Sequence, residues 1–342
     1  MSRRLLIVEA VCAGALSGPN GEPCPESWRR EGRAMLSAVV GDLATFDAIR
    51  VTALWDRRPE PPPCIPGVIW EDRTTVPFSE QVAAAARKHD RTLLIAPETD
   101  GLLESLVARV RQSGAAVANS GIDAIRLTTD KLALADHLTA QGVPTISTCD
   151  ALSFTPDDLP EGWAFPLVVK PRDGAGSQGL RLVETLSAWK RATLLHGDIV
   201  QPWLTGDALS IAAIIPDDDP AAVTFLPPAR QHISQETHGL YLGGKLPAEQ
   251  VPVEAIESLA RAALATLPGL RGYIGCDIVW PDGATAPLLC EINPRLTTSF
   301  VGYRTLYGPA LARALALGES FRPPVTTKRV AFTADGHVTP FR

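Results

Sequence analysis

The stretch Pro166-Leu-Val-Val-Lys-Pro-Arg-Asp-Gly-Ala-Gly-Ser-Gln-Gly-Leu-Arg-Leu-Val183 decides the fold, because two short apolar runs flank a glycine-rich segment. The runs 166–171 and 180–183 have the length of strands, and the glycines between them let the chain reverse. The sequence therefore predicts a β-hairpin with a long tip at 173–179. Backbone amides in such a tip can turn toward an anion. A plain hairpin tip is the alternative, since the segment follows neither the P-loop pattern nor the dinucleotide-binding fingerprint.

Lys170 makes the anion-binding interpretation more specific. It stands at the end of an apolar strand, directly before the tip, where a lysine is costly to bury without an anionic partner. A phosphate group would supply that partner. The hairpin is therefore a candidate phosphate-binding element.

A second set of polar residues lies on two predicted strands further along the chain. Asp277 is on the first, and Glu291 and Asn293 share one face of the second because they are two residues apart. Three oxygen ligands are thereby expected to converge, and Mg²⁺ is usually held by one or two carboxylates together with substrate phosphates. The alternative is a pair of buried acids neutralised by Arg271 or Arg295.

The N-terminal third alternates between strand and helix patterns, which favours a parallel sheet with helical crossovers. Strands are expected at 5–8, 50–55, 68–70 and 92–96, and helices at 31–40, 80–88 and 101–112. The proline-rich segment 58–66 is a connector, because consecutive prolines do not fit a helix interior or a central strand. The first domain is predicted at 1–118.

A different unit begins after residue 118. A helix is expected at 130–141, with Asp130 or Thr129 near its N-cap. Further strands are expected at 198–201, 209–215, 222–226, 272–280 and 286–292, and a further helix at 253–267. The predicted division is 119–196 for a small subdomain with the glycine-rich tip, and 197–342 for a C-terminal subdomain with the metal site.

Composition narrows the class of protein. The chain has 342 residues, 45% of them hydrophobic, which suffices for substantial cores, and its net charge of −6 gives no general attraction for nucleic acid. Six cysteines without a C-x-x-C pair indicate a reducing compartment, hence the cytoplasm. No apolar run reaches the ~18 residues that span a membrane. The start, 3–16, imitates a signal peptide, but Glu9 inside the apolar run favours a buried strand.

Several motifs occur in an order that resembles the ATP-grasp superfamily over roughly residues 119–310. They are Asp130-Lys131, the strand 166–171 with its glycine-rich tip, Gln201-Pro-Trp-Leu204, Asp277 and Glu291-Ile-Asn-Pro-Arg295. The resemblance implies an α/β (α+β) chain with an ATP-grasp fold and an N-terminal Rossmann-like pre-ATP-grasp domain that binds substrate.

The resemblance also implies roles for individual residues. Lys131 and Lys170 would bind ATP phosphates, Gly174, Gly176 and Ser177 would form a lid over them, Gln201, Pro202, Trp203 and Leu204 would contact adenine, and Asp207 would lie near the ribose. Asp277, Glu291 and Asn293 would hold one or two Mg²⁺ ions, with Mn²⁺ as a substitute. Arg295 would steady the transferred phosphoryl group or acyl phosphate.

Two positions depart from the family pattern. Gln201 stands where many members have an acid, although a glutamine carbonyl can still accept a hydrogen bond from the adenine amino group. Ala208 stands where many relatives have a ribose-binding glutamate, which leaves Asp207 one position early. The ribose contact is therefore the least secure part of the implied site.

Within the superfamily, further segments look similar to the tyramine–glutamate ligase branch of methanofuran-type cofactor synthesis. These segments are Glu31-Gly-Arg-Ala-Met-Leu36, Asn119-Ser120, Leu226-x-x-x-Arg-Gln231 and Gly243-Gly244. Arg230, Gln231 and Arg33 are then candidates for holding substrate carboxylates, since arginine offers a planar bidentate fork. For Arg33 the alternative is a solvated position on a helix.

The expected function is an ATP-dependent carboxylate–amine ligase that forms an amide through an acyl phosphate. Glutamate with tyramine or tyrosine is the expected substrate pair, in methanofuran- or methylofuran-type cofactor synthesis. The alternatives are another ATP-grasp ligase or carboxylase of a small molecule, and a nucleotide-binding regulatory module without turnover. Nucleic acid and membranes are not expected as partners, whereas a homodimer is expected by analogy with such ligases.

Overall fold

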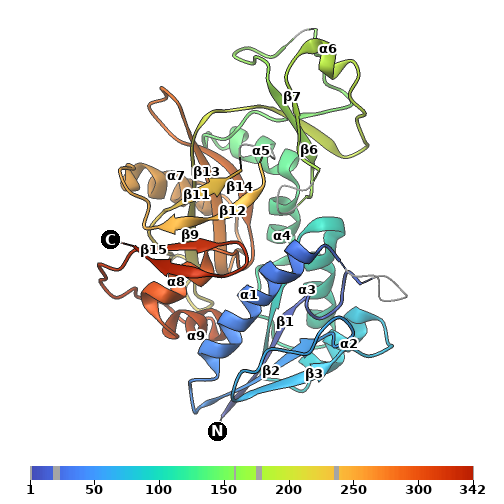
Figure 1. Ribbon diagram of the computed structural model, residues 1–342, viewed down its shortest axis with the longest axis vertical. Coiled ribbons are helices and arrows are strands. Elements are labelled where there is room, and N and C mark those ends of the chain that lie inside the picture. The colour runs from blue at the N-terminus through green and yellow to red at the C-terminus, as the bar shows by residue number, and fades with distance from the viewer. Residues whose placement is uncertain (1, 18–23, 158, 175–178, 235–238, 342) are drawn as a thin grey trace.

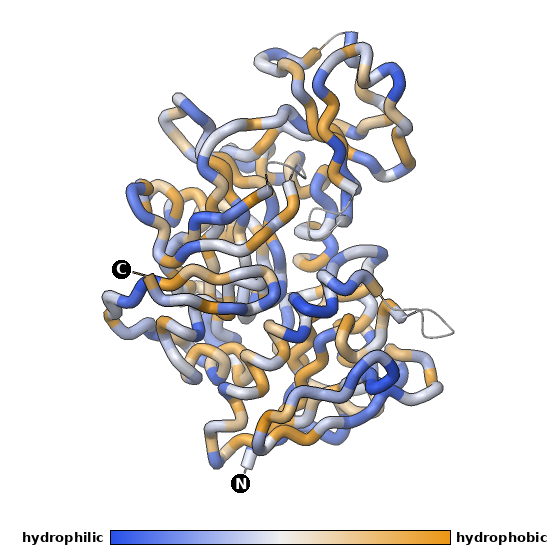
Figure 2. Tube along the Cα trace, viewed as in Figure 1, coloured by the Kyte–Doolittle hydropathy of each residue, from blue (hydrophilic) through white to orange (hydrophobic). Residues whose placement is uncertain are grey.

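Three β-sheets organise the computed structural model of the chain, which describes residues 2–17, 24–157, 159–174, 179–234 and 239–341. Figure 1 shows a parallel sheet at the lower right, a large sheet at the left and a small sheet at the top. In Figure 2 the hydrophobic stretches follow strands and inner helix faces, whereas hydrophilic stretches gather at outer turns. Among the described residues, no helix is both long and apolar enough to cross a membrane.

The parallel sheet forms from the N-terminal strands, as the alternating pattern predicts. Its strands are β1 (Arg3–Glu9), β2 (Ile49–Trp55), β3 (Val68–Asp72) and β4 (Arg91–Ile95), in the order β3-β2-β1-β4 and all parallel. The crossover helices are α1 (Glu26–Leu43), α2 (Phe78–Ala86) and α3 (Leu102–Gln112). Leu5 and Ile7 belong to the core on the α1 side, and Leu6 and Val8 to the core against α2 and α3. Both faces are covered, which is typical of parallel sheets.

Two helices connect this sheet to the rest of the chain. They are α4 (Ile122–Thr129), which the sequence pattern did not predict, and α5 (Lys131–Ala140); a single 3-10 turn, η1 (Thr99–Gly101), precedes α3. The side chain of Asp130 accepts a hydrogen bond from the backbone amide of Ala133 at 2.9 Å, which confirms the expected N-cap of α5. This cap places Lys131 in the first turn of the helix.

The small sheet contains the hairpin that the opening stretch predicts. Its strands, in sheet order, are β5 (Cys149–Asp150), β8 (Asp198–Pro202), β6 (Leu167–Pro171) and β7 (Arg181–Val183), with α6 (Leu186–Trp189) beside them. β6 and β7 are antiparallel, so the hairpin is confirmed, while residues 175–178 of its tip lie outside the described residues. Trp163, Leu167 and Val169 form the core of this sheet. β8 pairs with β6 although it begins after residue 196, the predicted subdomain boundary.

The large sheet is antiparallel and carries most of the C-terminal half. Its strands are β9 (Gly206–Ile215), β10 (Thr224–Phe225), β11 (Ala229–Ile233), β12 (Tyr241–Leu246), β13 (Gly272–Pro281), β14 (Leu288–Asn293), β15 (Val330–Thr333) and β16 (Val338–Pro340). The helices are α7 (Val253–Ala265), α8 (Phe300–Tyr307) and α9 (Ala310–Leu317). The strand expected at 222–226 is shorter than predicted, and β11, β12, β15, β16, α6, α8 and α9 were not predicted.

One hydrophobic core joins the parallel sheet to the large sheet. It runs from α1 to α8 and α9, where Phe300 and Tyr303 are fully buried. Burying side chains of this size contributes roughly 1.5–3 kcal/mol each. Ion pairs cross the same junction: Arg304 Nε lies 2.8 Å from Asp42 Oδ2, and Arg91 lies 2.5 Å from Asp217. The junction therefore holds the ends of β1 and β4 beside the segment that follows β14.

Candidate functional site

The acidic residues singled out from the sequence come together on neighbouring strands. β13 and β14 pair antiparallel with Asp277 opposite Glu291 and Gly275 opposite Asn293. Asn293 Nδ2 donates a hydrogen bond to Asp277 Oδ2 at 3.0 Å, and the neighbouring charge of Glu291 acts on Asp277. The predicted convergence of three oxygen-bearing side chains is therefore present. We call Asp277, Glu291 and Asn293 the carboxylate cluster.

Gln231 joins this cluster from β11. Its Nε2 donates a hydrogen bond to Asp277 Oδ1 at 2.7 Å. The sequence suggested Gln231 as a holder of a substrate carboxylate, but its side chain contacts the cluster instead. The two residues are 46 positions apart in the sequence. Their contact depends on the order of the strands in the large sheet, in which β9 lies between β11 and β13.

Two lysines supply positive charge beside the cluster. Lys131 Nζ lies 3.4 Å from Glu291 Oε2 and donates a hydrogen bond of 2.6 Å to the carbonyl oxygen of Gly174. Lys170 lies close enough to interact electrostatically with both Glu291 and Lys131. The helix α5, the hairpin tip and the carboxylate cluster therefore meet at one point.

Among the described residues neither Arg271 nor Arg295 forms a hydrogen bond or ion pair with the two acids, although the charge of Arg295 acts on Glu291. Arg271 Nη1 donates instead to the carbonyl oxygen of Asp217 at 2.8 Å. Arg295 Nε lies 2.9 Å from each carboxylate oxygen of Glu98, and its Nη2 lies 2.8 Å from one of them. The lysines, which the sequence analysis placed on phosphates, take the neutralising role in this structure.

The electrostatics of the cluster separate its two acids. Burial and the nearby charge of Glu291 raise the pKa of Asp277. Burial alone would raise the pKa of Glu291 too, but Lys131 and Lys170 hold it well below its usual value. Burial lowers the pKa of Lys170, opposed by the attraction of Glu291. The two carboxylates lie close together and offer oxygen ligands of the kind that Mg²⁺ prefers. A bound divalent cation would relieve the repulsion between their negative charges.

The expected adenine segment begins on β8, next to the strand that carries Lys170. Gln201 is buried, and its Nε2 donates to Thr148 Oγ1 at 2.8 Å, which leaves its side-chain carbonyl as an acceptor. The backbone amide of Trp203 donates to the carbonyl oxygen of Pro166 at 3.1 Å. Pro202 and Leu204 flank it in the same segment. The segment and Lys170 therefore lie on adjacent strands of the small sheet.

Other residues suggested for substrate or ribose are paired with protein groups. Arg230 forms an ion pair with Asp207 and donates to the carbonyl oxygen of Glu249 at 3.2 Å. Arg33, 44% exposed on α1, lies 2.6 Å from Glu60. Of the hairpin tip, Gly174 is described, whereas Gly176 and Ser177 lie outside the described residues. Neither arginine contacts the carboxylate cluster through a hydrogen bond or ion pair found among the described residues.

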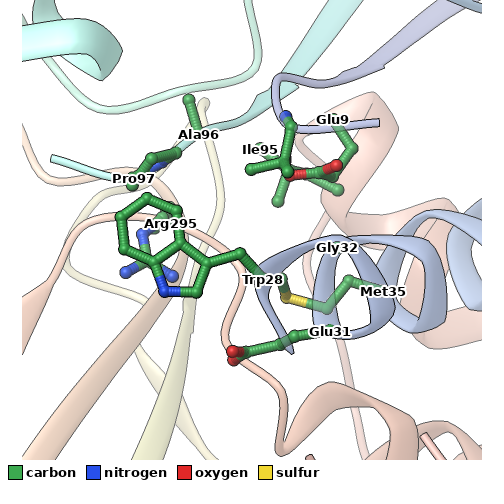
Figure 3. Close-up of a pocket in the computed structure, with 10 residues that line it drawn as sticks. Glu9, Trp28, Glu31, Gly32, Met35, Ile95, Ala96, Pro97 and Arg295 are labelled. Atoms are coloured by element: carbon green, nitrogen blue, oxygen red, sulfur yellow. The ribbon is translucent and has the colours of Figure 1, made fainter. Parts of the chain in front are cut away.

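A pocket of about 60 Å³ lies beside the cluster, where the ends of β1 and β4 meet α1 and Arg295 (Figure 3). Its lining includes Glu9, Trp28, Glu31 and Met35. Sequence reasoning assigned no role to Glu9 or Glu31. The available signal was Glu9 itself, a carboxylate inside an otherwise apolar strand.

The chain belongs to the ATP-grasp family, in keeping with the two lysines beside the carboxylate cluster. Residues 128–299 match the family described as ATP-grasp domain, and residues 49–125 match the pre ATP-grasp 3 domain. The predicted fold class, an ATP-grasp fold with an N-terminal pre-ATP-grasp domain, is thereby confirmed.

Two curated relatives with the same name are similar to this chain. The chain is 26% identical over 232 residues to tyramine–L-glutamate ligase from Methanocaldococcus fervens, which covers 67% of this chain and 65% of the relative. It is 25% identical over 226 residues to the enzyme of the same name from Methanocaldococcus jannaschii, covering 66% of this chain and 61% of the relative. The match thus spans less than two thirds of either relative.

Solved structures extend the similarity over nearly the whole chain. A protein from Archaeoglobus fulgidus assigned to the ATP-grasp superfamily has a TM-score of 0.70 at 25% identity, covering 97% of this chain and 92% of that protein. N5-carboxyaminoimidazole synthetase from Staphylococcus aureus has a TM-score of 0.71 at 14% identity, covering 97% and 82%. The second likeness shows the fold alone.

Proposed function

We propose that the protein is an ATP-dependent carboxylate–amine ligase that forms ADP. The observation that carries the proposal is the meeting of Lys131 and Lys170 with the carboxylate cluster, which combines phosphate-binding cations and oxygen ligands for Mg²⁺ in one site. Phosphoryl transfer needs mainly positioning and charge neutralisation from the protein, and this set supplies both.

The proposed reaction has two steps. An oxygen of the substrate carboxylate attacks the γ-phosphorus of ATP, the bond to the bridging oxygen breaks, and ADP leaves. The amine nitrogen then attacks the acyl carbon, inorganic phosphate leaves, and the nitrogen loses a proton to solvent or phosphate. Splitting amide formation in this way replaces one difficult step by two easier ones.

The proposed residue roles are those that the resemblance to the ATP-grasp superfamily implies. Lys131 and Lys170 would hold ATP phosphates beneath the lid that contains Gly174, Gly176 and Ser177, and residues 201–204 would hold adenine, with Asp207 near the ribose. Asp277, Glu291 and Asn293 would hold one or two Mg²⁺ ions or Mn²⁺; when bound, the metal supplies charge neutralisation. Arg295 would steady the transferred phosphoryl group. Arg230 would contact substrate once its pairing with Asp207 is exchanged.

The substrate pair follows from the named relatives. We infer glutamate as the acid and tyramine or tyrosine as the amine, with a product destined for methanofuran- or methylofuran-type cofactor synthesis. The reaction would take place in the cytoplasm, carried out by a homodimer. Light scattering on the purified protein tests the dimer separately from the chemistry.

The decisive experiment measures ADP formation from Mg²⁺-ATP with glutamate fixed and the amine varied, and identifies the product by mass. An amide of glutamate with tyramine or tyrosine supports the proposal. If ADP forms only with other acceptors, the protein is still an ATP-dependent ligase, but the proposed substrate pair is wrong. Nucleotide binding without turnover under all substrate combinations would instead favour a regulatory module.

Paired variants connect the activity to the site. Lys170→Ala should weaken ATP binding at least tenfold, whereas Lys190→Ala, an exposed lysine at the C-terminal end of α6, should leave it unchanged. Glu291→Gln should lower turnover by orders of magnitude with folding nearly intact. Glu254→Gln, an exposed residue of α7, is its control. Native kinetics in Glu291→Gln would remove this residue from the metal site.

A further inference from the structure

The pocket beside Arg295 lies at a position where parallel sheets commonly bind ligands. From β1 the chain continues to β2 on one side, and later returns to β4 on the other side of β1. The carboxyl ends of two strands between which the order reverses form a crevice suited to a ligand. Glu9 ends β1, and Ile95 ends β4, and both line this pocket.

The charges around the pocket favour a cation. Arg295 is the only arginine or lysine that lines it among the described residues, and Glu98 engages its guanidinium with both oxygens. Glu9 and Glu31 form no ion pair among the described residues, although the charge of Arg295 also acts on Glu31. Glu9 accepts backbone hydrogen bonds from Cys12 at 2.7 Å and Val11 at 3.2 Å, and burial raises its pKa. Glu31 accepts a hydrogen bond from the hydroxyl of Thr298.

The remaining walls of the pocket are apolar. Trp28, Glu31, Gly32 and Met35 lie on one face of α1, at the spacing of successive helical turns. Figure 3 shows the indole of Trp28 and the side chain of Met35 on the same side of the pocket as Glu31. The glycine is required, because a Cβ atom at position 32 would collide with the carboxylate of Glu9. Gly32 thus leaves room for the carboxylate of Glu9 beside α1. The indole of Trp28 and the thioether of Met35 form the apolar wall of the pocket.

The pocket is also next to the proposed reaction centre. Arg295, which lines it, follows Asn293 of the carboxylate cluster by two residues. A molecule in the pocket would therefore lie near the group that the ATP site activates.

We propose that this pocket binds the amine substrate, with its ammonium group facing Glu9 and Glu31 and its aromatic body along Trp28 and Met35. The choice of an amine as the ligand rests on the proposed ligase function. An ammonium ion beside carboxylates and an aromatic ring over apolar side chains are both favourable contacts. A free dicarboxylate would meet two further carboxylates here, which disfavours it.

Calorimetric titration tests the pocket without requiring turnover. The probes are tyramine and 4-hydroxyphenylethanol, which carries a hydroxyl in place of the ammonium group. In Glu31→Gln the dissociation constant for tyramine should rise at least tenfold, whereas the weaker binding of the alcohol should stay unchanged. Glu26→Gln, an exposed residue of the same helix, should leave tyramine binding within twofold of native. Equal losses for both probes, or no tyramine binding to the native protein with or without Mg²⁺-ADP, would overturn the proposal.

A second variant covers the case in which Glu31→Gln does not fold. Met35→Lys replaces the methionine by a side chain of nearly the same length that carries an ammonium group into the pocket. The tyramine titration should then show no binding while ADP affinity stays native. Native tyramine affinity in this variant would overturn the proposal.

Steady-state kinetics separate this proposal from the proposed function. Tyramine binding that depends on Glu31, without ADP formation under any condition, supports the pocket and rejects the ligase function. Ligase activity in which Glu31→Gln raises KM for glutamate and leaves KM for tyramine native supports the function and overturns the pocket assignment. A rise confined to KM for the amine supports both.

Discussion

Replacing Asp277 by asparagine is expected to stabilise the metal-free protein at neutral pH. In the native chain burial and the adjacent Glu291 raise the pKa of Asp277 to about 8, so its charged form is disfavoured in the fold. Asparagine has nearly the same shape and can still take part in hydrogen bonds with Gln231 and Asn293. The variant thus removes the repulsion between the two acids, and it also removes a proposed metal ligand. Substitutions at functional sites often raise stability and lower activity in this way.

The pH dependence has a definite sign. An acid whose pKa is raised on folding contributes stability that is fully present below its unfolded pKa, near 3.8, and is lost as the pH rises toward the folded pKa. Because the pKa of Glu291 is lowered, its protonation affects stability only below about pH 5. Between pH 5 and 7, the pH-dependent difference in stability between the native protein and Asp277→Asn therefore comes from Asp277. One proton corresponds to about 1.4 kcal/mol per pH unit. With roughly 0.7 kcal/mol per kelvin for a chain of this length, Tm should fall by about 2 °C per pH unit more in the native protein.

Differential scanning calorimetry in EDTA at pH 5, 6 and 7 measures this effect. The Asp277→Asn protein should have the higher Tm at pH 7, by an amount that grows with pH. Asp218→Asn, which neutralises an exposed acid, should follow the native curve. Added Mg²⁺ should stabilise the native protein more than Asp277→Asn. Parallel native and Asp277→Asn curves, or a lower Tm for Asp277→Asn at pH 7, would refute the reasoning.

Three further changes have defined outcomes. Glu98→Gln should lower the free energy of unfolding by about 3 kcal/mol, because Arg295 loses the partner of a buried ion pair; urea denaturation measures it, and a change below ~0.5 kcal/mol would contradict the pairing. Gly206→Ala should lower Tm by several degrees, because φ is +145° there and a methyl group meets the carbonyl of Trp280; a native Tm would contradict this. Asp130→Ala should cost about 1 kcal/mol at pH 7. That cost should shrink as the pH falls through the lowered pKa of Asp130, and a constant cost in acid denaturation curves would argue against the cap.

The parts of the fold that depend on neighbours in sequence were predictable. The strands of the hairpin, β6 and β7, and the antiparallel strands β13 and β14 are consecutive in the chain, so a local pattern suffices to predict their pairing. Placing Asp277 opposite Glu291 follows from that pairing. The N-terminal alternation gave the parallel sheet because each helix covers the strands on either side of it in sequence.

The parts that depend on distant segments were not predictable from the pattern. Gln231 reaches Asp277 only because β11 and β13 both flank β9 in the large sheet. Glu98 and Arg295 are 197 positions apart, and no local signal relates them. β12 contains Gly243 and Gly244, which hide its strand character, yet a Cβ atom at either would press on the neighbouring strand.

The face of α1 that lines the pocket has a consequence for the evolution of the family. Four lining residues come from this one helix, while the carboxylate cluster and both lysines come from other elements. Under the proposed roles of the two sites, substitutions along a single helix would change the amine that is accepted and would leave the ATP site unchanged. Laboratory diversification confined to positions 28, 31 and 35, with Gly32 kept, follows the same division and offers a compact route to ligases for other amines.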